Sequence, residues 1–279
     1  MRTWRVGNDS VDEADLGLAM LFFDIDGTLI TEGKNRYIPE STIYALEKAK
    51  EKGHRIFINT GRVFCNLEES LRALDFDGYV CGCGTYIVAD GQLLLHKQTS
   101  KERCRAIAQC CRENGLIALF EHADHNGYDK AVAQISNLPI LEYFMKMEGT
   151  LQDDITADDF CFDKFAAWYD PKTAKLDVCK KFLEEDFTCI QREGDFIEVV
   201  PKGYSKATGI QRMLDFYQES PDKVYVFGDS NNDLDMLKFA DNSIAMGVCT
   251  PQVKAVATYQ TDRVEDDGIL HAMEHFGLI

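Results

Sequence analysis

Two aspartates, Asp24 and Asp26, stand directly after an apolar run near the start of the chain, where residues 22–30 read FFDIDGTLI. Side chains two positions apart point to the same side of a strand, so both carboxylates can enter one pocket. Such carboxylates repel each other unless a cation lies between them or one keeps its proton. Gly27 permits a sharp turn, and the backbone amides around Gly27 and Thr28 can face an anion. The pattern predicts a site for a divalent cation and an anionic group; an Asx turn is the structural alternative.

A second polar cluster follows an apolar run late in the chain, where residues 223–236 read KVYVFGDSNNDLDM. Magnesium takes one or two protein carboxylates and fills its other positions with water and substrate oxygens. Asp229 is placed to complete such a site from a neighbouring strand. Asp233 would then orient a metal-bound water, and the Asn232 amide would donate to a phosphate oxygen. Taken alone, the same residues also suit the N-cap of a helix.

Two further segments offer groups that suit a phosphate. Thr60 and Gly61 lie between an expected strand and the N-terminus of a helix, which is a ready anion site, and Arg62 could pair with substrate or with an inserted domain. Lys206 stands at the start of an amphipathic helix, where a cation gains nothing from the helix dipole. We therefore expect Lys206 to serve an anion, with Lys202 as the competing lysine.

The elements that must position these groups are short apolar strands separated by helical patterns. Strands are expected at 19–23, 54–59, 78–82, 223–228 and 242–247, and helices at 41–52, 63–74, 205–218 and 234–239. This alternation is typical of a parallel sheet covered on both faces. Such a sheet places its site at the carboxyl ends of its strands, where each of the polar clusters begins.

The middle of the chain has a different pattern, with alternating apolar and polar stretches that suit an antiparallel sheet, and helices at 101–114 and 173–185. We therefore expect an N-terminal extension at 1–18, an α/β core made of 19–86 and 191–279, and an inserted α+β domain at 87–190. The acidic segment 153–159 is most simply a solvated turn.

Composition excludes several partners. The 279 residues include 47 Asp plus Glu and 30 Lys plus Arg, a formal net charge of −17. This balance argues against nucleic acid and against an anionic membrane surface. The apolar run at 16–23 is too short to span a membrane, and its acidic flank does not suit a signal peptide, so a cytoplasmic location is expected. The ten cysteines then are free thiols in a reducing compartment.

Together the four polar segments resemble the haloacid dehalogenase (HAD) superfamily of phosphohydrolases, and the insertion resembles its Cof-like subfamily. The resemblance covers the chain from about residue 19 onward and implies a Rossmann-like parallel-sheet core with an inserted α+β cap domain. It implies that Asp24 is the nucleophile that forms an aspartyl-phosphate and that Asp26 is the general acid and base. Thr60 would orient the phosphoryl group, and Lys206 would steady the charge. The implied magnesium ligands are Asp24, the backbone carbonyl of Asp26, and Asp229, with Asp233 in support.

Two loops depart from the family pattern. Residues 81–85 read CGCGT, where an Asn-Gly-Ala-like turn is usual, and residues 245–249 read AMGVC, where an asparagine often follows the glycine. Neither departure removes a catalytic group.

The expected activity is therefore Mg²⁺-dependent hydrolysis of phosphomonoesters of small metabolites, sugar phosphates first. A phosphosugar mutase of the same superfamily and a non-enzymatic module that accepts phosphate on an aspartate are the alternatives. The oligomeric state stays open. Several cap residues could contact the leaving group, although each also suits a surface or cap-core position: Glu121, His122, Asp124, Asn126, Lys164 and Trp168.

Overall fold

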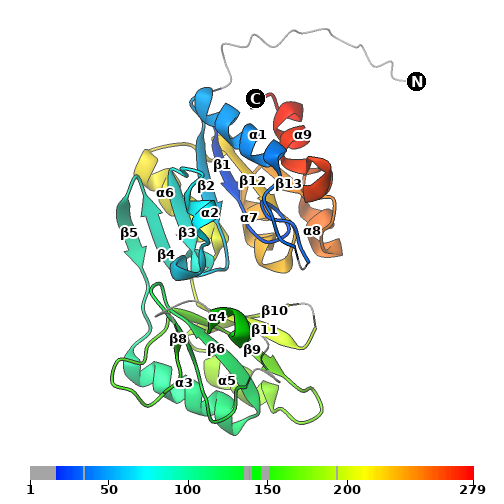
Figure 1. Ribbon diagram of the computed structural model, residues 1–279. Coiled ribbons are helices and arrows are strands. Elements are labelled where there is room, and N and C mark those ends of the chain that lie inside the picture. Colours follow the sequence, from blue (N-terminus) through cyan, green and yellow to red (C-terminus); the bar gives the residue numbers. More distant parts are fainter. Residues whose placement is uncertain (1–16, 34, 135–137, 139, 146–150, 193) are drawn as a thin grey trace, which may run out of the picture.

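A computed structural model describes residues 17–33, 35–134, 138, 140–145, 151–192 and 194–279 and contains two sheets, each covered by helices (Figure 1). The larger sheet forms an α/β core and the smaller one an inserted α+β cap, so the predicted fold class is confirmed. Of the expected N-terminal extension, residues 1–16 lie outside the described residues.

The core sheet has eight strands, of which β14 to β3 in the spatial order run parallel and the last two form an antiparallel hairpin. From edge to edge they are β14 (Tyr259–Gln260), β13 (Asn242–Ala245), β12 (Val224–Gly228), β1 (Met20–Phe23), β2 (Arg55–Asn59), β3 (Gly78–Cys81), β4 (Tyr86–Ala89) and β5 (Gln92–His96). The strands expected from the apolar runs are all present. Their carboxyl ends meet at one edge, which faces the cap (Figure 1).

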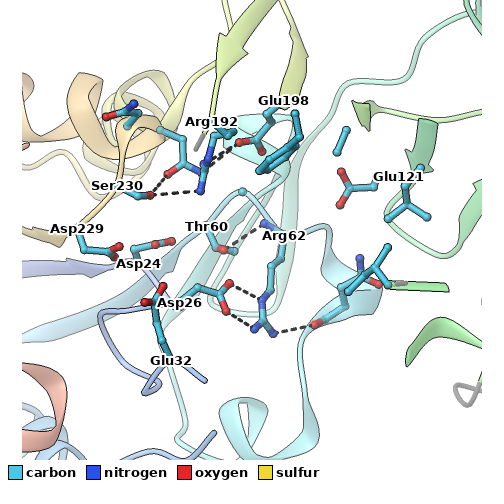
Figure 2. A pocket seen from close by; sticks show the side chains of 18 of the residues that line it. Asp24, Asp26, Glu32, Thr60, Arg62, Glu121, Arg192, Glu198, Asp229 and Ser230 are labelled. Carbon is cyan, nitrogen blue, oxygen red and sulfur yellow. Dashed lines mark hydrogen bonds and ion pairs between the residues drawn. The ribbon is translucent and has the colours of Figure 1, made fainter. Parts of the chain in front are cut away.

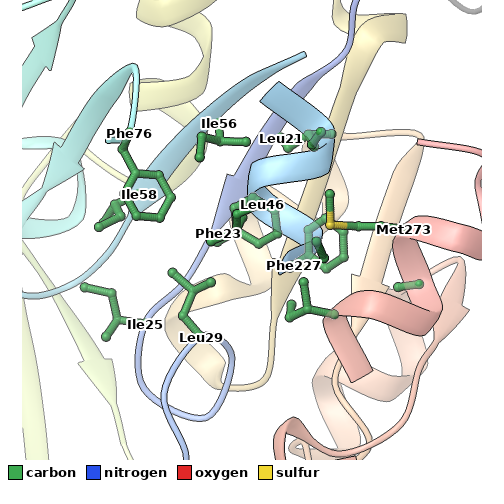
Figure 3. Close-up of a cluster of buried hydrophobic side chains, with 14 of the residues drawn as sticks. Leu21, Phe23, Ile25, Leu29, Leu46, Ile56, Ile58, Phe76, Phe227 and Met273 are labelled. Carbon is green, nitrogen blue, oxygen red and sulfur yellow. The ribbon is translucent and has the colours of Figure 1, made fainter. Parts of the chain in front are cut away.

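The central strand β1 is buried on both faces because its side chains alternate between two apolar clusters. Leu21 and Phe23 pack with α1 (Glu40–Glu51) and α9 (Gly268–His275), as Figure 3 shows. Met20 and Phe22 pack on the opposite face with α6 (Lys206–Tyr217), α7 (Leu234–Phe239) and α8 (Pro251–Val256). Burial on both sides explains why this strand is apolar without interruption up to Asp24.

The cap is a six-stranded sheet with its two longer helices on one face. Its strands in spatial order are β10 (Phe187–Gln191), β11 (Phe196–Pro201), β9 (Lys164–Tyr169), β6 (Leu116–Glu121), β7 (Asn126–Tyr128) and β8 (Leu151–Gln152). The covering helices are α3 (Lys101–Glu113) and α5 (Leu176–Leu183), and a short helix α4 (Ile140–Phe144) lies on the side toward the core (Figure 1).

Side chains alternate along each cap strand, so the two faces differ in character. On β9, Phe165 and Ala167 join the apolar cluster under α3 and α5. Lys164, Ala166 and Trp168 face the other way and line a cavity toward the core. The acidic segment 153–159 forms turns, with its aspartates exposed, as the sequence predicts.

The strand pairings place both boundaries between core and cap at other residues than the sequence predicts. Residues 87–96 were expected to begin the cap. Together with Tyr86 they form the hairpin β4–β5, which extends the core sheet from β3. Gln191 and residues 196–201, expected in the core, form the end of β10 and all of β11 in the cap sheet. The alternating pattern correctly indicates antiparallel strands, but a hairpin can add to the edge of either sheet, and local pattern does not say which.

The helix expected at 63–74 is also wrong in its extent. The segment contains a 3₁₀ turn (Phe64–Asn66) and a short helix, α2 (Glu69–Arg72), separated by extended backbone at Leu67 and Glu68. The turn docks on the cap, where the Cys65 amide donates to the Ala123 carbonyl at 2.8 Å. A continuous helix would lose this tertiary contact, which outweighs local propensity.

The loop after β3 holds the start of α6 in place. Gly82, Cys83 and Gly84 all have positive φ, and a methyl group on Gly84 would overlap the backbone oxygen of Ser205. Ser205 caps α6 reciprocally with Thr208. Residues 81–85, the CGCGT sequence that departs from the family pattern, therefore form a loop whose backbone packs closely against the N-terminus of α6.

Replacing Gly84 by Ala is expected to lower the free energy of unfolding by clearly more than Gly91→Ala does. Both glycines have positive φ, +89° and +72°, but nothing lies near a Cβ on Gly91. Gly91→Ala therefore shows the backbone cost alone, about 1–2 kcal/mol, and the excess at Gly84 measures the clash with Ser205. Chemical denaturation of both variants checks this; equal losses would contradict it.

Candidate active site

The polar groups singled out in the sequence meet at the carboxyl edge of the core sheet (Figure 2). Asp24 follows β1, Thr60 follows the adjacent β2, and Asp229 follows β12 on the other side of β1. All three line a cavity of about 560 Å³ between the core edge and the cap. The parallel order of the strands therefore brings together residues that are about 35 to 200 positions apart in the chain.

Lys206 is fully buried and joins two of the carboxylates. Its Nζ lies 2.6 Å from Asp24 Oδ1 and 2.5 Å from Asp233 Oδ1. Burial alone lowers the pKa of this ammonium, but the charges of Asp233 and Asp24 raise it above the ordinary lysine value, so Lys206 is charged. The competing Lys202 bonds the carbonyl of Glu184 on the cap instead.

Asp229 is held by its neighbours on two sides. Thr28 Oγ1 donates to Asp229 Oδ1 at 2.9 Å. Gly27 has φ +80°, and a Cβ there would lie 2.8 Å from the Asp229 carboxylate, so the glycine is required for both its turn and its size. Asp233 Oδ2 accepts the amides of Asp229 and Ser230 at 2.9 and 2.8 Å, which fixes the loop that carries Asp229.

The donor set suits a hard divalent cation. Oxygens of Asp24, Asp229 and Asp233 lie within 4.8 Å of one another, and all three residues are buried. Burial, reinforced by the neighbouring carboxylates, raises the pKa of Asp24 to about 7 and that of Asp229 to about 9. One ammonium does not balance three carboxylates, whereas an oxygen-seeking cation would. Asp24 and Asp229 line the cavity, while Asp233 already bonds Lys206 and two amides, so the first two are the ones placed to bind such an ion.

Asp26 is gripped by two arginines. Arg62 Nε and Nη2 donate to its two carboxylate oxygens at 2.8 and 2.6 Å, and Arg36 pairs with the same group. Burial tends to raise the pKa of Asp26, but the bonds and charges of Arg62 and Arg36 bring it below the ordinary value. Arg62, expected to meet substrate, also pairs with Glu68 at 3.2 Å. In this conformation its guanidinium orients Asp26.

The phosphate-binding candidates Thr60, Gly61 and Asn232 lie at the junction with the cap. Thr60 Oγ1 accepts the Arg62 amide at 3.1 Å. The Gly61 carbonyl accepts from Lys164 at 3.1 Å, and a Cβ on Gly61 would crowd Asn232 and Glu198 at under 3 Å. Asn232 Nδ2 donates to Glu198 Oε2 at 3.2 Å.

A network of charged side chains forms part of the cavity wall on the cap side. Lys164 lies between Glu121 at 2.6 Å and Glu198 at 2.8 Å, and Arg192 pairs with Glu198 at 3.0 Å. Although burial favours the neutral acid, Lys164 and Arg192 hold the pKa of Glu198 well below its usual range. Glu198 also accepts from Cys83 in the loop after β3, so the CGCGT loop touches the cap.

The cavity wall also contains charged residues that were not predicted from the sequence, among them Glu198, Arg192, Arg36 and Glu32. For Glu198 a signal existed, because a charged residue interrupts the apolar run FIEVV of β11. Of the suggested cap residues, Glu121, Lys164 and Trp168 line the cavity; His122, Asp124 and Asn126 do not. Asn126 instead bonds Asn66 at the docking contact between cap and core.

The cap wall also has an apolar part. Trp168 and Phe196 stack with ring centroids 5.1 Å apart and planes 11° from parallel, and Leu119, Ile140 and Ala166 lie on the same side of the cavity. Among the described residues no helix has the length and apolarity to cross a membrane.

Comparison with known proteins gives consistent matches over nearly the whole chain. A family model described as haloacid dehalogenase-like hydrolase matches residues 21–273. YkrA of Bacillus subtilis (strain 168), named as a phosphatase, is 27% identical over 269 residues, which cover 93% of this chain and 98% of YkrA. YitU of the same strain, named 5-amino-6-(5-phospho-D-ribitylamino)uracil phosphatase, is 22% identical over 285 residues, 93% of this chain and 98% of YitU.

A solved structure of the HAD subclass IIB sugar phosphatase BT4131 superposes with a TM-score of 0.78 and 30% identity, covering 94% of this chain and 100% of that one. The match therefore includes both the core and the cap. With these full-length likenesses and the family match over residues 21–273, the chain belongs to the haloacid dehalogenase-like hydrolases and is a phosphatase that acts on phosphorylated substrates.

Proposed function

We propose that this phosphatase is Mg²⁺-dependent and hydrolyses monophosphate esters of small metabolites, sugar phosphates first, through an aspartyl-phosphate on Asp24. The main support is the place of Asp24 at the floor of the cavity, where Lys206 bonds Oδ1. We assign the attack on phosphorus to Oδ2. Asp24, Asp229 and the backbone carbonyl of Asp26 would hold the ion, which supplies charge neutralisation at the phosphate oxygens.

Two proton transfers by Asp26 complete the reaction. In the first half, the bond from Asp24 to phosphorus forms, the bond to the leaving oxygen breaks, and Asp26 gives that oxygen a proton. In the second half, Asp26 takes a proton from water as the water oxygen attacks phosphorus, and the bond to Asp24 breaks. Lys206 stabilises the negative charge throughout, with Thr60 and Asn232 as donors to the phosphate oxygens.

Asp26 must lose hydrogen bonds to Arg62 and Arg36 before its carboxylate can carry a proton. A phosphate dianion entering the cavity competes with Asp26 for the guanidiniums of Arg62 and Arg36, since both line the same space. Transfer of a guanidinium to phosphate frees Asp26 for protonation. This exchange gives Arg62 the substrate contact expected from the sequence.

The cavity walls favour a leaving group without a second anionic group. Each of the four cations among the described lining residues is already paired with a carboxylate: Arg36, Arg62, Lys164 and Arg192. The same lining contains seven carboxylates: Asp24, Asp26, Glu32, Glu68, Glu121, Glu198 and Asp229. The stacked rings of Trp168 and Phe196 offer a flat apolar face to an uncharged group. The substrates in the names of BT4131 and YitU, a sugar phosphate and a phosphoribityl compound, are consistent with this.

This charge pattern also weighs against the mutase alternative, because a sugar bisphosphate needs a second cationic pocket. The receiver alternative lacks support, since the relatives are named as phosphatases and a cap covers the site. We further infer that the enzyme acts on free metabolites in the cytoplasm, because all ten cysteines are free thiols and the net charge of −17 repels nucleic acid.

Asp24→Asn is expected to lower kcat by at least about 10³-fold while the fold persists, since an amide cannot accept the phosphoryl group. Asp235→Asn, at an exposed position of α7, serves as the matched control and keeps its rate. Phosphate release and circular dichroism check both variants. Comparable turnover by the Asp24→Asn variant would refute the assignment.

Removal of divalent cations is expected to abolish phosphate release, because no ion then neutralises the charge on the phosphate oxygens. Chelation followed by dialysis tests this, and added Mg²⁺ should restore the rate. Asp229→Asn should raise the Mg²⁺ concentration needed for half-maximal activity. Full activity in the dialysed protein would contradict the proposal.

Among matched substrates, glucose 6-phosphate is expected to exceed 6-phosphogluconate in kcat/KM by at least about 10-fold, because the extra carboxylate meets unbalanced carboxylates. Trp168→Ala should raise KM for the better substrate by about 3- to 10-fold, since it removes an aromatic face. Steady-state phosphate release measures both. Equal efficiency on the two esters would overturn the uncharged-leaving-group inference and leave the Asp24 mechanism untouched.

A further inference from the structure

A second cluster of ligand-type side chains lies outside the catalytic cavity, where the core passes into the cap. His96 ends β5 of the core sheet, His122 follows β6 of the cap, and Asp163 precedes β9 of the cap. None of the three lines the catalytic cavity. Asp163 and His122 are buried, and His96 is half-buried.

The potential ligand atoms of these three residues lie close together. His96 Nε2 lies 3.0 and 3.1 Å from the two oxygens of Asp163, and His122 Nε2 lies 3.9 Å from Asp163 Oδ1. One ligand atom from each residue can be chosen so that all lie within 4.8 Å of one another. The Ala123 amide donates to Asp163 Oδ2 at 2.9 Å and fixes the carboxylate.

One buried ring nitrogen beside this cluster lacks a hydrogen-bond partner among the described residues. A third imidazole, His125, stacks on His122 with ring centroids 4.6 Å apart. Its Nε2 is buried and has no hydrogen-bond partner among the described residues.

We propose that His96, His122 and Asp163 form a Zn²⁺ site that ties the core sheet to the cap. Two imidazoles and one carboxylate are ligands that zinc accepts, with water in the fourth position. Zinc-to-ligand distances near 2.0–2.2 Å place ligand atoms of one tetrahedral ion about 3.3 Å apart. The separations of 3.0 to 3.9 Å to Asp163 bracket this value, so side-chain adjustment suffices.

Zinc binding requires a defined proton balance. The proton between His96 Nε2 and Asp163 leaves to solvent, since both atoms become ligands. His122 Nδ1 accepts the Asp124 amide at 3.2 Å, which places the ring proton on Nε2. That proton must move to Nδ1, so the Asp124 amide loses this acceptor. The Asp124 carboxylate, 3.8 Å from Nδ1, must then move closer to accept a hydrogen bond from the new Nδ1–H group. The Gln98 amide, 3.1 Å from His122 Nε2, gives up its contact.

The site would act on the relation between the two domains, because its ligands come from both. Bound zinc resists separation of β5 from the strands β6 and β9. Ligation of the folded form also stabilises the protein in proportion to the free zinc concentration. The function is thus separate from hydrolysis and can be measured without substrate.

The test is calorimetric titration of the full chain with ZnCl₂ in excess Mg²⁺, which keeps the acidic catalytic site filled. Wild type is expected to bind one Zn²⁺ per chain, and His96→Gln and His122→Gln should each weaken binding by at least about 10-fold. The matched control is His271→Gln, because His271 pairs with an aspartate, Asp262, at 2.8 Å on the surface. It should bind like wild type.

Asp124→Ala supplies a variant that keeps the fold, since the Asp124 side chain is exposed; it should weaken zinc binding through loss of the acceptor for His122 Nδ1–H. Thermal melts read out the same site, with a zinc-dependent rise in Tm for wild type and His271→Gln that is lost in the other variants. Failure of wild type to bind zinc in excess Mg²⁺ would overturn the proposal. Equal binding by all variants would do the same.

Discussion

The buried ammonium of Lys206 lies in contact with the carboxylates of Asp24 and Asp233, and the geometry of the catalytic edge depends on this contact. Like charges within 4.8 Å in a site of low polarity repel strongly, so three carboxylates need a fixed cation to stay together. Lys206 can serve because α6 begins at that residue. The capping by Ser205 and the bond from Asn59 Nδ2 to the Lys206 carbonyl at 3.1 Å hold the helix start rigidly.

The cap carries a related arrangement with the charges reversed. There the buried carboxylate of Glu198 lies between Lys164 and Arg192, and it reaches the core through Asn232 and Cys83. A buried carboxylate that lost these partners would be costly, so the network favours the closed arrangement of the domains. The strand alternation of the cap makes this possible, because the opposite face is committed to packing under α3 and α5.

The sequence predicted most of the core because local pattern and global fold agree there. Each apolar run ends in the polar residues that the sheet then gathers at one edge, so Asp24, Thr60 and Asp229 could be grouped from their places in the sequence alone. The affiliation of β4, β5 and β11 could not be predicted, since an alternating hairpin fits either sheet. The partner of Arg62 was equally inaccessible: Asp26 lies 36 positions away, and their pairing depends on loop conformations that residue types do not determine.

The close packing of Gly84 against Ser205 has a consequence for motion. The chain leaves the cap at the end of β11, Pro201, and reaches Lys206 only five residues later. If nothing held this short connection, a rotation of the cap would move the Lys206 ammonium away from Asp24. The backbone contact between Gly84 and Ser205 lies between Pro201 and Lys206 and holds the chain at that point. The cap can therefore rotate about the residues before Ser205 while Lys206 keeps its contact with Asp24.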